Sequence, residues 1–162
     1  MSLQQQIDNY RIYFGAEMPA GKAEEVIDRW RAAAQAMAGG EGVELAAPFQ
    51  RHYTTFGTGL PPNFCLVLTP AEVLAFKFDP RHSQHPLDVS ARQIKKEAAR
   101  WPRRAVRATG VEPGKLAYGV ELEIADGSGG VRTIACRTPR LSVNPAAAVM
   151  ITELGGQLPA PG

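Results

Sequence analysis

The chain has 162 residues, 44% hydrophobic and 21% charged, which is enough for one sizeable core but short for two independent domains. No run reaches the roughly 18 apolar residues of a membrane helix. The opening MSLQQQIDNYR has neither the basic n-region nor the apolar h-region of a secretion signal, so we expect a cytoplasmic protein. The net charge of +2 is uneven, because residues 1–80 hold 6 basic and 9 acidic side chains and residues 81–162 hold 12 and 7.

The first strong pattern predicts a helix from about Gly21 to Ala38, with acidic residues early, frequent alanine, and Gly39-Gly40 where a C-cap belongs. Apolar side chains at helical spacing form one stripe: Val26, Ile27, Trp30, Ala33, Ala34 and Met37. We expect this stripe to pack on the following domain, with a dimer interface as the alternative. The preceding segment, IDNYRIYFGAEMP, is apolar and aromatic enough for a strand or an ordered arm.

Short β-like segments follow the helix. Aromatic and branched residues predict three strands, FQRHYTTF at 49–56, NFCLVLT at 63–69 and EVLAFKFD at 72–79. The second and third are joined by the tight connection Thr69-Pro70-Ala71, so we expect a hairpin there.

A second hairpin is predicted in KLAYGVELEIADGSGGVRTIACRT, where apolar and acidic residues alternate before a turn at Asp126-Gly127. The last element is a helix from about Pro145 to Leu154, with Asn144 as its N-cap and Gly155-Gly156 as its terminator. The final QLPAPG is expected to be a flexible tail.

Residues 90–101 support two interpretations. As a helix, the segment has a capping box from Ser90 to Gln93 and an apolar face formed by Ala91, Ile94, Ala98 and Trp101. As a strand it alternates poorly, so the local pattern by itself favours the helix.

The order of segments resembles the pleckstrin-homology-like (PH-like) fold of small bacterial proteins. The resemblance rests on LVLTPAEVLAFKF, on RWPR followed by AVRAT, on the hairpin around ADGSGG, and on one helix after NP. The resemblance covers about residues 49–156 and implies a bent antiparallel β-barrel of about seven strands closed by a C-terminal helix. Together with the N-terminal helix, which lies outside the resemblance, the expected fold class is α+β. The resemblance places residues 94–101 on a strand, which we adopt over the helix because topology overrides local propensity. The expected divisions are an arm and helix at 1–45, the barrel at 46–156 and the tail at 157–162.

The resemblance also implies a binding or scaffolding module without catalytic residues. Lipid-binding members carry a basic motif between their first two strands, but GTGLPPN in this chain has no lysine or arginine, so a phosphoinositide function does not transfer. Basic charge gathers instead in one run, formed by Arg92, Lys95, Lys96, Arg100, Arg103, Arg104 and Arg107. This run is either a solvated face of two structural segments or a binding site.

If the run binds, we expect a protein partner first, with an anionic membrane surface also open and nucleic acid least favoured. We expect the guanidinium groups of Arg103, Arg104 and Arg107 to stay in water while Trp101 turns toward the core. Glu97 is the one acidic residue expected to oppose the run. The sequence leaves the oligomeric state open.

Other chemistry is weakly indicated. His82, His85, Asp79 and Asp88 lie in a proline-containing loop and could hold a metal, but no metal or cofactor is expected. Cys65 and Cys136 are in apolar surroundings typical of buried free thiols. No nucleophile elbow or helical HExxH occurs, so we expect no enzyme. The alternative is a cone-shaped α+β roll that binds or converts a small molecule, a fold that usually ends in long strands.

Overall fold

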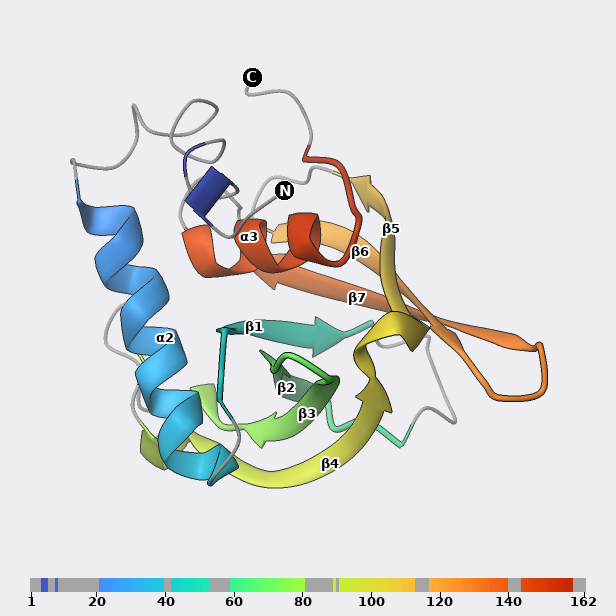
Figure 1. The fold of residues 1–162 in the computed structure, drawn as a ribbon, viewed down its shortest axis with the longest axis horizontal. Coiled ribbons are helices and arrows are strands. Elements are labelled where there is room, and N and C mark those ends of the chain that lie inside the picture. The colour runs from blue at the N-terminus through green and yellow to red at the C-terminus, as the bar shows by residue number, and fades with distance from the viewer. Residues whose placement is uncertain are drawn as a thin grey trace.

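The computed structural model in Figure 1 describes residues 4–5, 8, 21–39, 42–52, 59–80, 89, 91–112, 117–139 and 144–158. Its principal elements are two long helices, seven strands and two short 3-10 turns. In chain order they are α2 (Lys22–Ala38), β1 (Leu45–Arg51), β2 (Asn63–Leu68), β3 (Glu72–Phe78), η3 (Ala91–Gln93), β4 (Ile94–Pro102), η4 (Arg103–Ala105), β5 (Val106–Glu112), β6 (Ala117–Ala125), β7 (Val131–Pro139) and α3 (Pro145–Glu153).

The strands form one antiparallel sheet in the order β4-β3-β2-β1-β7-β6-β5. The first and last strands meet over a short stretch, where Gln50 pairs with Arg137 and Arg51 with Cys136. The predicted strand count is therefore confirmed. The predicted barrel is not closed among the described residues, because β4 and β5 stand at opposite ends of the pairing order and are joined through η4. Pro102 at that corner has no backbone N–H to extend a ladder.

Strand β1 starts earlier than the sequence pattern predicts, at Leu45, and includes Pro48 in a central strand. The proline is tolerated because β1 pairs with β7 only from Gln50 onward. On that side the carbonyl of Pro48 accepts a hydrogen bond of 2.9 Å from the hydroxyl of Thr138, and no ladder N–H is required. The sequence predicted a strand over residues 49–56, and its last part, residues 53–56, lies outside the described residues.

Residues 94–102 form a strand, which confirms the topological expectation over the helical pattern. Pairing with β3 satisfies the backbone groups on one side of the strand, and Ile94 is buried opposite Phe78. Ala98, which the helical face would bury, is exposed, while Trp101 is half-buried and packs against the core. An edge strand of this kind buries few side chains, so its sequence shows little alternation.

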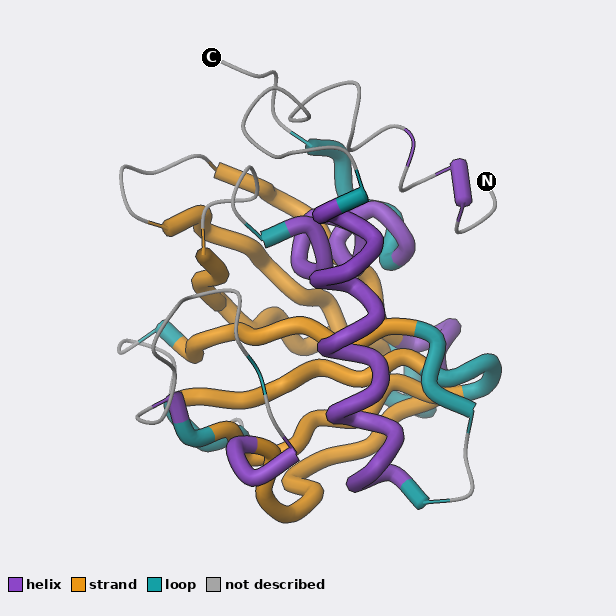
Figure 2. Tube along the Cα trace, turned by 90° about the vertical axis from the view of Figure 1, so that its left-hand side faces the viewer, coloured by secondary structure: helices purple, strands orange, loops and turns teal. Residues whose placement is uncertain are grey.

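The N-terminal helix is part of the single apolar core. Helix α2 lies against β1, β4 and α3, running across the strands (Figure 2), and its buried face is Ala23, Val26, Ile27, Trp30, Ala33 and Ala34. The expected docking within the chain is confirmed, except that Met37 is exposed. The Trp30 and Phe78 rings lie 5.5 Å apart. The proposed division at residue 45 stays a prediction.

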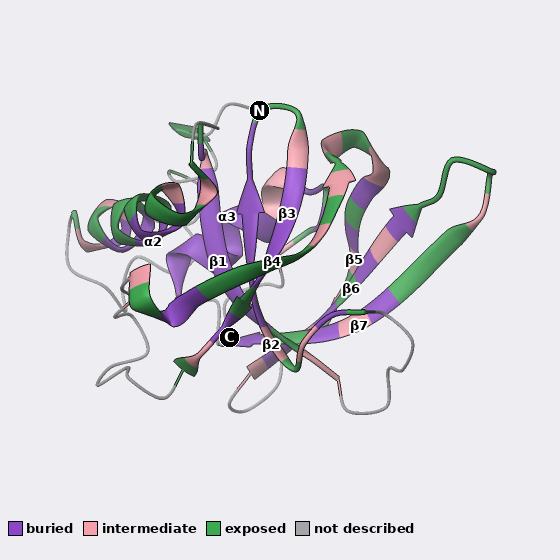
Figure 3. Ribbon diagram, turned by 90° about the horizontal axis from the view of Figure 1, so that it is seen from below, coloured by how far each residue is buried: buried purple, intermediate pink, exposed green. Residues whose placement is uncertain are grey.

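The C-terminal helix covers the interior of the sheet. Every residue of α3 from Pro145 to Ile151 is buried (Figure 3), and the side-chain oxygen of Asn144 caps the helix by accepting a hydrogen bond from the N–H of Ala147. The helix ends in a Schellman motif, in which Gly155 and Gly156 donate to the carbonyls of Thr152 and Ile151. A buried helix that follows the last described strand and packs on the sheet agrees with the PH-like expectation.

The carbonyl of Leu154 accepts a hydrogen bond of 2.9 Å from the N–H of Ala108, so the end of α3 holds the free edge of β5. This contact needs Gly156, since a Cβ there would lie 2.7 Å from Ile151 and 3.2 Å from Ala108. Leu158, which the sequence places in the flexible tail, packs against the core.

The docking of α2 gives a matched test. Ala34→Asp places a carboxylate on the fully buried face, whereas Ala36→Asp adds the same group to the exposed face of the same helix. We expect the first change to lower the free energy of unfolding by about 3 kcal/mol, because the buried charge has no partner. The second should change it by less than about 0.5 kcal/mol. Urea denaturation followed by circular dichroism measures both, and equal effects would mean that α2 is not part of the core.

Candidate functional site

The structure divides the predicted basic run into two groups. Arg100, Arg103 and Arg107 form ion pairs. Among the described residues no ion pair involves the others, which are Arg92, Lys95, Lys96 and Arg104. The expectation that Glu97 alone opposes the run is therefore wrong, because carboxylates distant in sequence fold onto it.

Arg103 is a structural residue, contrary to the expectation that its guanidinium stays in water. Its side chain is only 24% exposed, and its Nη1 lies 2.6 Å from Glu44 and 3.0 Å from the carbonyl oxygen of Thr69. Its Nη2 lies 2.8 Å from Glu153. Because the guanidinium has several donors in a planar fork, one side chain joins the entry to β1, the β2–β3 turn and the end of α3.

Two further arginines are also neutralised. Arg100 contacts Glu72 at 2.8 Å and Glu97 at 2.7 Å. Arg107 is 70% exposed and lies 4.0 Å from Glu123, a pair too exposed to contribute much.

A β-bulge gathers the lysines. Phe76 pairs with Glu97 and Phe78 pairs with Ile94, so one residue of β3 stands opposite two of β4. The single residue is Lys77 and the two are Lys95 and Lys96. A bulge of this kind interrupts alternation and re-aims side chains, so three lysines from two strands come to line one concavity.

These lysines line a concavity of about 630 Å³, together with Asn63, Phe78, Asp79 and Pro80. All three lysines are exposed, and within the described part of the chain none has an ion-pair or hydrogen-bond partner. Asp79 is the one carboxylate among the described lining residues, so the site carries a net positive charge. We call this set the lysine pocket.

The backbone around the lysine pocket is held in place from two directions. Asp79 and Gln93 exchange hydrogen bonds, with the N–H of Asp79 donating to Gln93 at 2.8 Å and the Gln93 amide donating back at 3.3 Å. These bonds fasten the end of β3 to the turn before β4. Beneath them Trp30 of α2 packs on Phe78. The pocket is therefore built on a rigid base.

Sequence reasoning found Lys95 and Lys96 but missed Lys77 and Asn63. Lys77 is the single charge in the run VLAFKF of the predicted strand at 72–79, and its side chain is exposed on β3. The sequence has no signal for the bulge that sets Lys77 opposite both other lysines.

The sequence also singled out two cysteines and a possible metal site. Cys65 and Cys136 are free and buried, as expected, and burial raises the pKa of each thiol to about 12. Among the described residues no group of three or more His, Cys, Asp or Glu side chains could hold a metal ion. His82, His85 and Asp88 lie outside the described residues. No described helix is both long and apolar enough to span a membrane.

Comparisons with known proteins give little further information. No protein-family model and no curated protein matches the chain. A solved structure of the PDZ-RhoGEF DH/PH domains in complex with GTP-γ-S-activated RhoA is similar with a TM-score of 0.41 and 11% identity. The similarity covers 82% of this chain and 38% of the other. A likeness at this level assigns neither family nor function.

The role of Arg103 can be tested against its neighbour. Arg103→Ala should lower the free energy of unfolding by about 2 kcal/mol, because it removes charged hydrogen bonds from a half-buried position. Arg104→Ala, an exposed position with no described ion pair, should change it by less than about 0.5 kcal/mol. Chemical denaturation of both variants measures the difference. If they match, Arg103 belongs to the solvated face after all.

The thiols provide a second test. Because a pKa of about 12 keeps both cysteines protonated at neutral pH, iodoacetamide should modify neither in the native protein. In denaturant both should react, which mass spectrometry can count. Rapid labelling of native Cys136 would mean that β7 opens locally.

Proposed function

We propose that the protein is a non-catalytic recognition module of PH-like architecture that binds an anionic segment of a protein partner through the lysine pocket. The observation that carries the proposal is the bulge that sets Lys95 and Lys96 opposite Lys77 around one concavity. Lys77, Lys95 and Lys96 have no ion pair with any described residue and are available to a ligand, whereas Arg100 and Arg103 are already engaged.

The architecture supports the PH-like part of the proposal. Two antiparallel meanders, β1–β4 and β5–β7, are followed by a helix that covers the sheet interior. Binding of carboxylate or phosphate groups requires no catalytic residue, only donors around a concave surface. Two buried free thiols suit a reducing compartment, so the proposal includes a cytoplasmic location.

The number of available lysines favours a protein partner. Each basic side chain near an anionic bilayer contributes about 1 kcal/mol, so three give only weak membrane attachment. Specific nucleic-acid binding commonly involves about 6 to 10 phosphate contacts, more than this pocket can make. An acidic protein segment can add hydrogen-bond and apolar contacts, for example with Asn63 and Pro80, which also line the pocket.

The test compares two triple variants with the same change in charge. Lys77→Gln/Lys95→Gln/Lys96→Gln removes the lysine pocket, and Arg104→Gln/Arg107→Gln/Arg132→Gln removes three exposed arginines elsewhere. We expect the first to bind a fluorescent hexaglutamate peptide at least about tenfold more weakly, a loss of about 1.4 kcal/mol, and the second less than about threefold more weakly. Fluorescence anisotropy at low salt measures both.

Parallel titrations with phosphatidylserine vesicles and a DNA duplex separate the alternatives. The proposal predicts weaker, salt-sensitive binding to both, with no preference for the lysine pocket. Equal losses in the two triple variants would reduce the basic run to a nonspecific charge effect. Tighter, pocket-dependent binding to vesicles would replace the protein partner with a membrane surface.

A further inference from the structure

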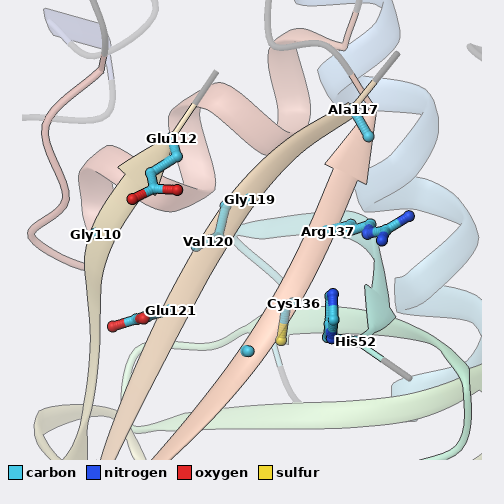
Figure 4. Close-up of a pocket in the computed structure, with 10 residues that line it drawn as sticks. His52, Gly110, Glu112, Ala117, Gly119, Val120, Glu121, Cys136 and Arg137 are labelled. Carbon is cyan, nitrogen blue, oxygen red and sulfur yellow. The ribbon is translucent and has the colours of Figure 1, made fainter. Parts of the chain in front are cut away.

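A second concavity lies on the other half of the sheet, on the outer face of β5, β6 and β7. Its volume is about 520 Å³, and its lining shares no residue with the lysine pocket. Its floor is made of small residues, and its charged side chains are Glu112, Glu121 and Arg137, with His52 beside them. Figure 4 shows the two carboxylates toward β5, and Arg137 and His52 on the opposite side of β6. We call this the dipolar groove.

The strand register sets an acid and a base on either side of a glycine. Glu112 of β5 pairs with Gly119 of β6, which pairs with Arg137 of β7. Neighbouring strands are about 4.8 Å apart, so the backbones of Glu112 and Arg137 are separated by about 10 Å. Gly119 has no side chain to fill the space between Glu112 and Arg137, so the groove is open between these two charged residues.

A β-bulge places Glu112 in this row. Thr109 pairs with Glu121, and the next pair is Glu112 with Gly119, so β5 carries one residue more than β6. Gly110, at φ 57°, occupies the left-handed region that favours glycine at such a bulge. Regular alternation would put Val111 on the outer face, whereas the bulge puts Glu112 there. This feature turns a hydrophobic position into an acidic one.

The next row repeats the arrangement. Glu121 pairs with Ala135, and the N–H of His52 donates to the carbonyl of Ala135 at 2.9 Å. The carboxylate of Glu121 lies over Gly110, where a Cβ would come within 3.3 Å of its Oε2. A small residue again separates the acidic side of the groove from the basic side.

The opposite charges of the groove are not paired with one another. On α2, exposed carboxylates and arginines meet directly, as in Arg29–Glu25 at 2.6 Å and Arg31–Asp28 at 2.9 Å. Within the described part of the chain, no ion pair or hydrogen bond involves the side chains of Glu112, Glu121 or Arg137. The intervening Gly119 and Ala135 keep them apart and leave a gap that a ligand of both charges can bridge.

We propose that the dipolar groove binds a short peptide with free termini, with its ammonium group at Glu112 and Glu121 and its carboxylate at Arg137. An extended chain spans about 3.3 to 3.6 Å per residue, so three residues reach about 10 Å, which matches the separation of the Glu112 and Arg137 backbones. A single amino acid is too short to contact both. The small-residue floor leaves room for the peptide backbone between the charges.

The experiment titrates the protein with triglycine and follows backbone amide shifts by NMR. Triglycine should shift the amides of Gly119 and Arg137, while N-acetyl-triglycine and triglycine amide, which each lack one charge, should bind at least about tenfold more weakly. Glycine should also bind more weakly. Equal binding of the blocked and free peptides would overturn the proposal. So would the absence of any amide shift at about 10 mM triglycine, a concentration high enough to detect a binding free energy of only a few kcal/mol.

Variants separate filling of the groove from loss of charge. Gly119→Val retains every charged residue but fills the floor, and the nearest atoms to the new Cβ, at 3.9 Å on Glu112, allow it to fold. Arg137→Gln removes the carboxylate contact. Both should lose triglycine binding at least about tenfold, while Arg132→Gln, an exposed arginine on the same strand, should not. If Gly119→Val does not fold, the Arg137→Gln variant alone tests the proposal. Triglycine binding as tight as in the parent protein would then refute the placement of the peptide carboxylate at Arg137.

The groove is independent of the lysine pocket. The triple variant Lys77→Gln/Lys95→Gln/Lys96→Gln should therefore bind triglycine as the parent does. A failure of hexaglutamate binding would leave this result untouched, so the two proposals can fail separately.

Discussion

The guanidinium of Arg103 holds together the corner on which the open sheet depends. Strands β4 and β5 are the two ends of the sheet and do not pair, and the two meanders are joined by the short ladder between β1 and β7. Arg103 bonds to Glu44, the Thr69 carbonyl and Glu153, and its own N–H donates to Ala71. Four bonds from one residue therefore hold a corner where three distant segments of the chain meet.

Both candidate sites result from bulges in the end strands. The bulge in β4 sets Lys95 and Lys96 opposite Lys77, and the bulge in β5 sets Glu112 in the row of Gly119. An end strand has one neighbour, so an extra residue disrupts one ladder instead of two. The bulges in the two end strands thus place charged residues on the outside of both halves of the sheet.

The N-terminal helix links folding to the lysine pocket. Trp30 packs on Phe78, a residue of the pocket lining, and Gln93 fastens the following turn to Asp79. Helix α2 therefore supports the site although none of its described residues lines it. This arrangement differs from a helix merely attached beside a complete barrel.

The sequence by itself determined most of the elements. Glycine, proline and asparagine signals located α3 and its Asn144 cap, and alternation located β6 and β7, because these depend on neighbours in the chain. Local pattern favoured a helix for residues 94–101, and only the PH-like resemblance led to the strand. Tertiary structure alone decided which charges are used. Glu44 and Glu153 are 59 and 50 residues from Arg103, and each bulge depends on the register between two strands. Register and long-range ion pairs arise when distant segments pack, so no local pattern encodes them.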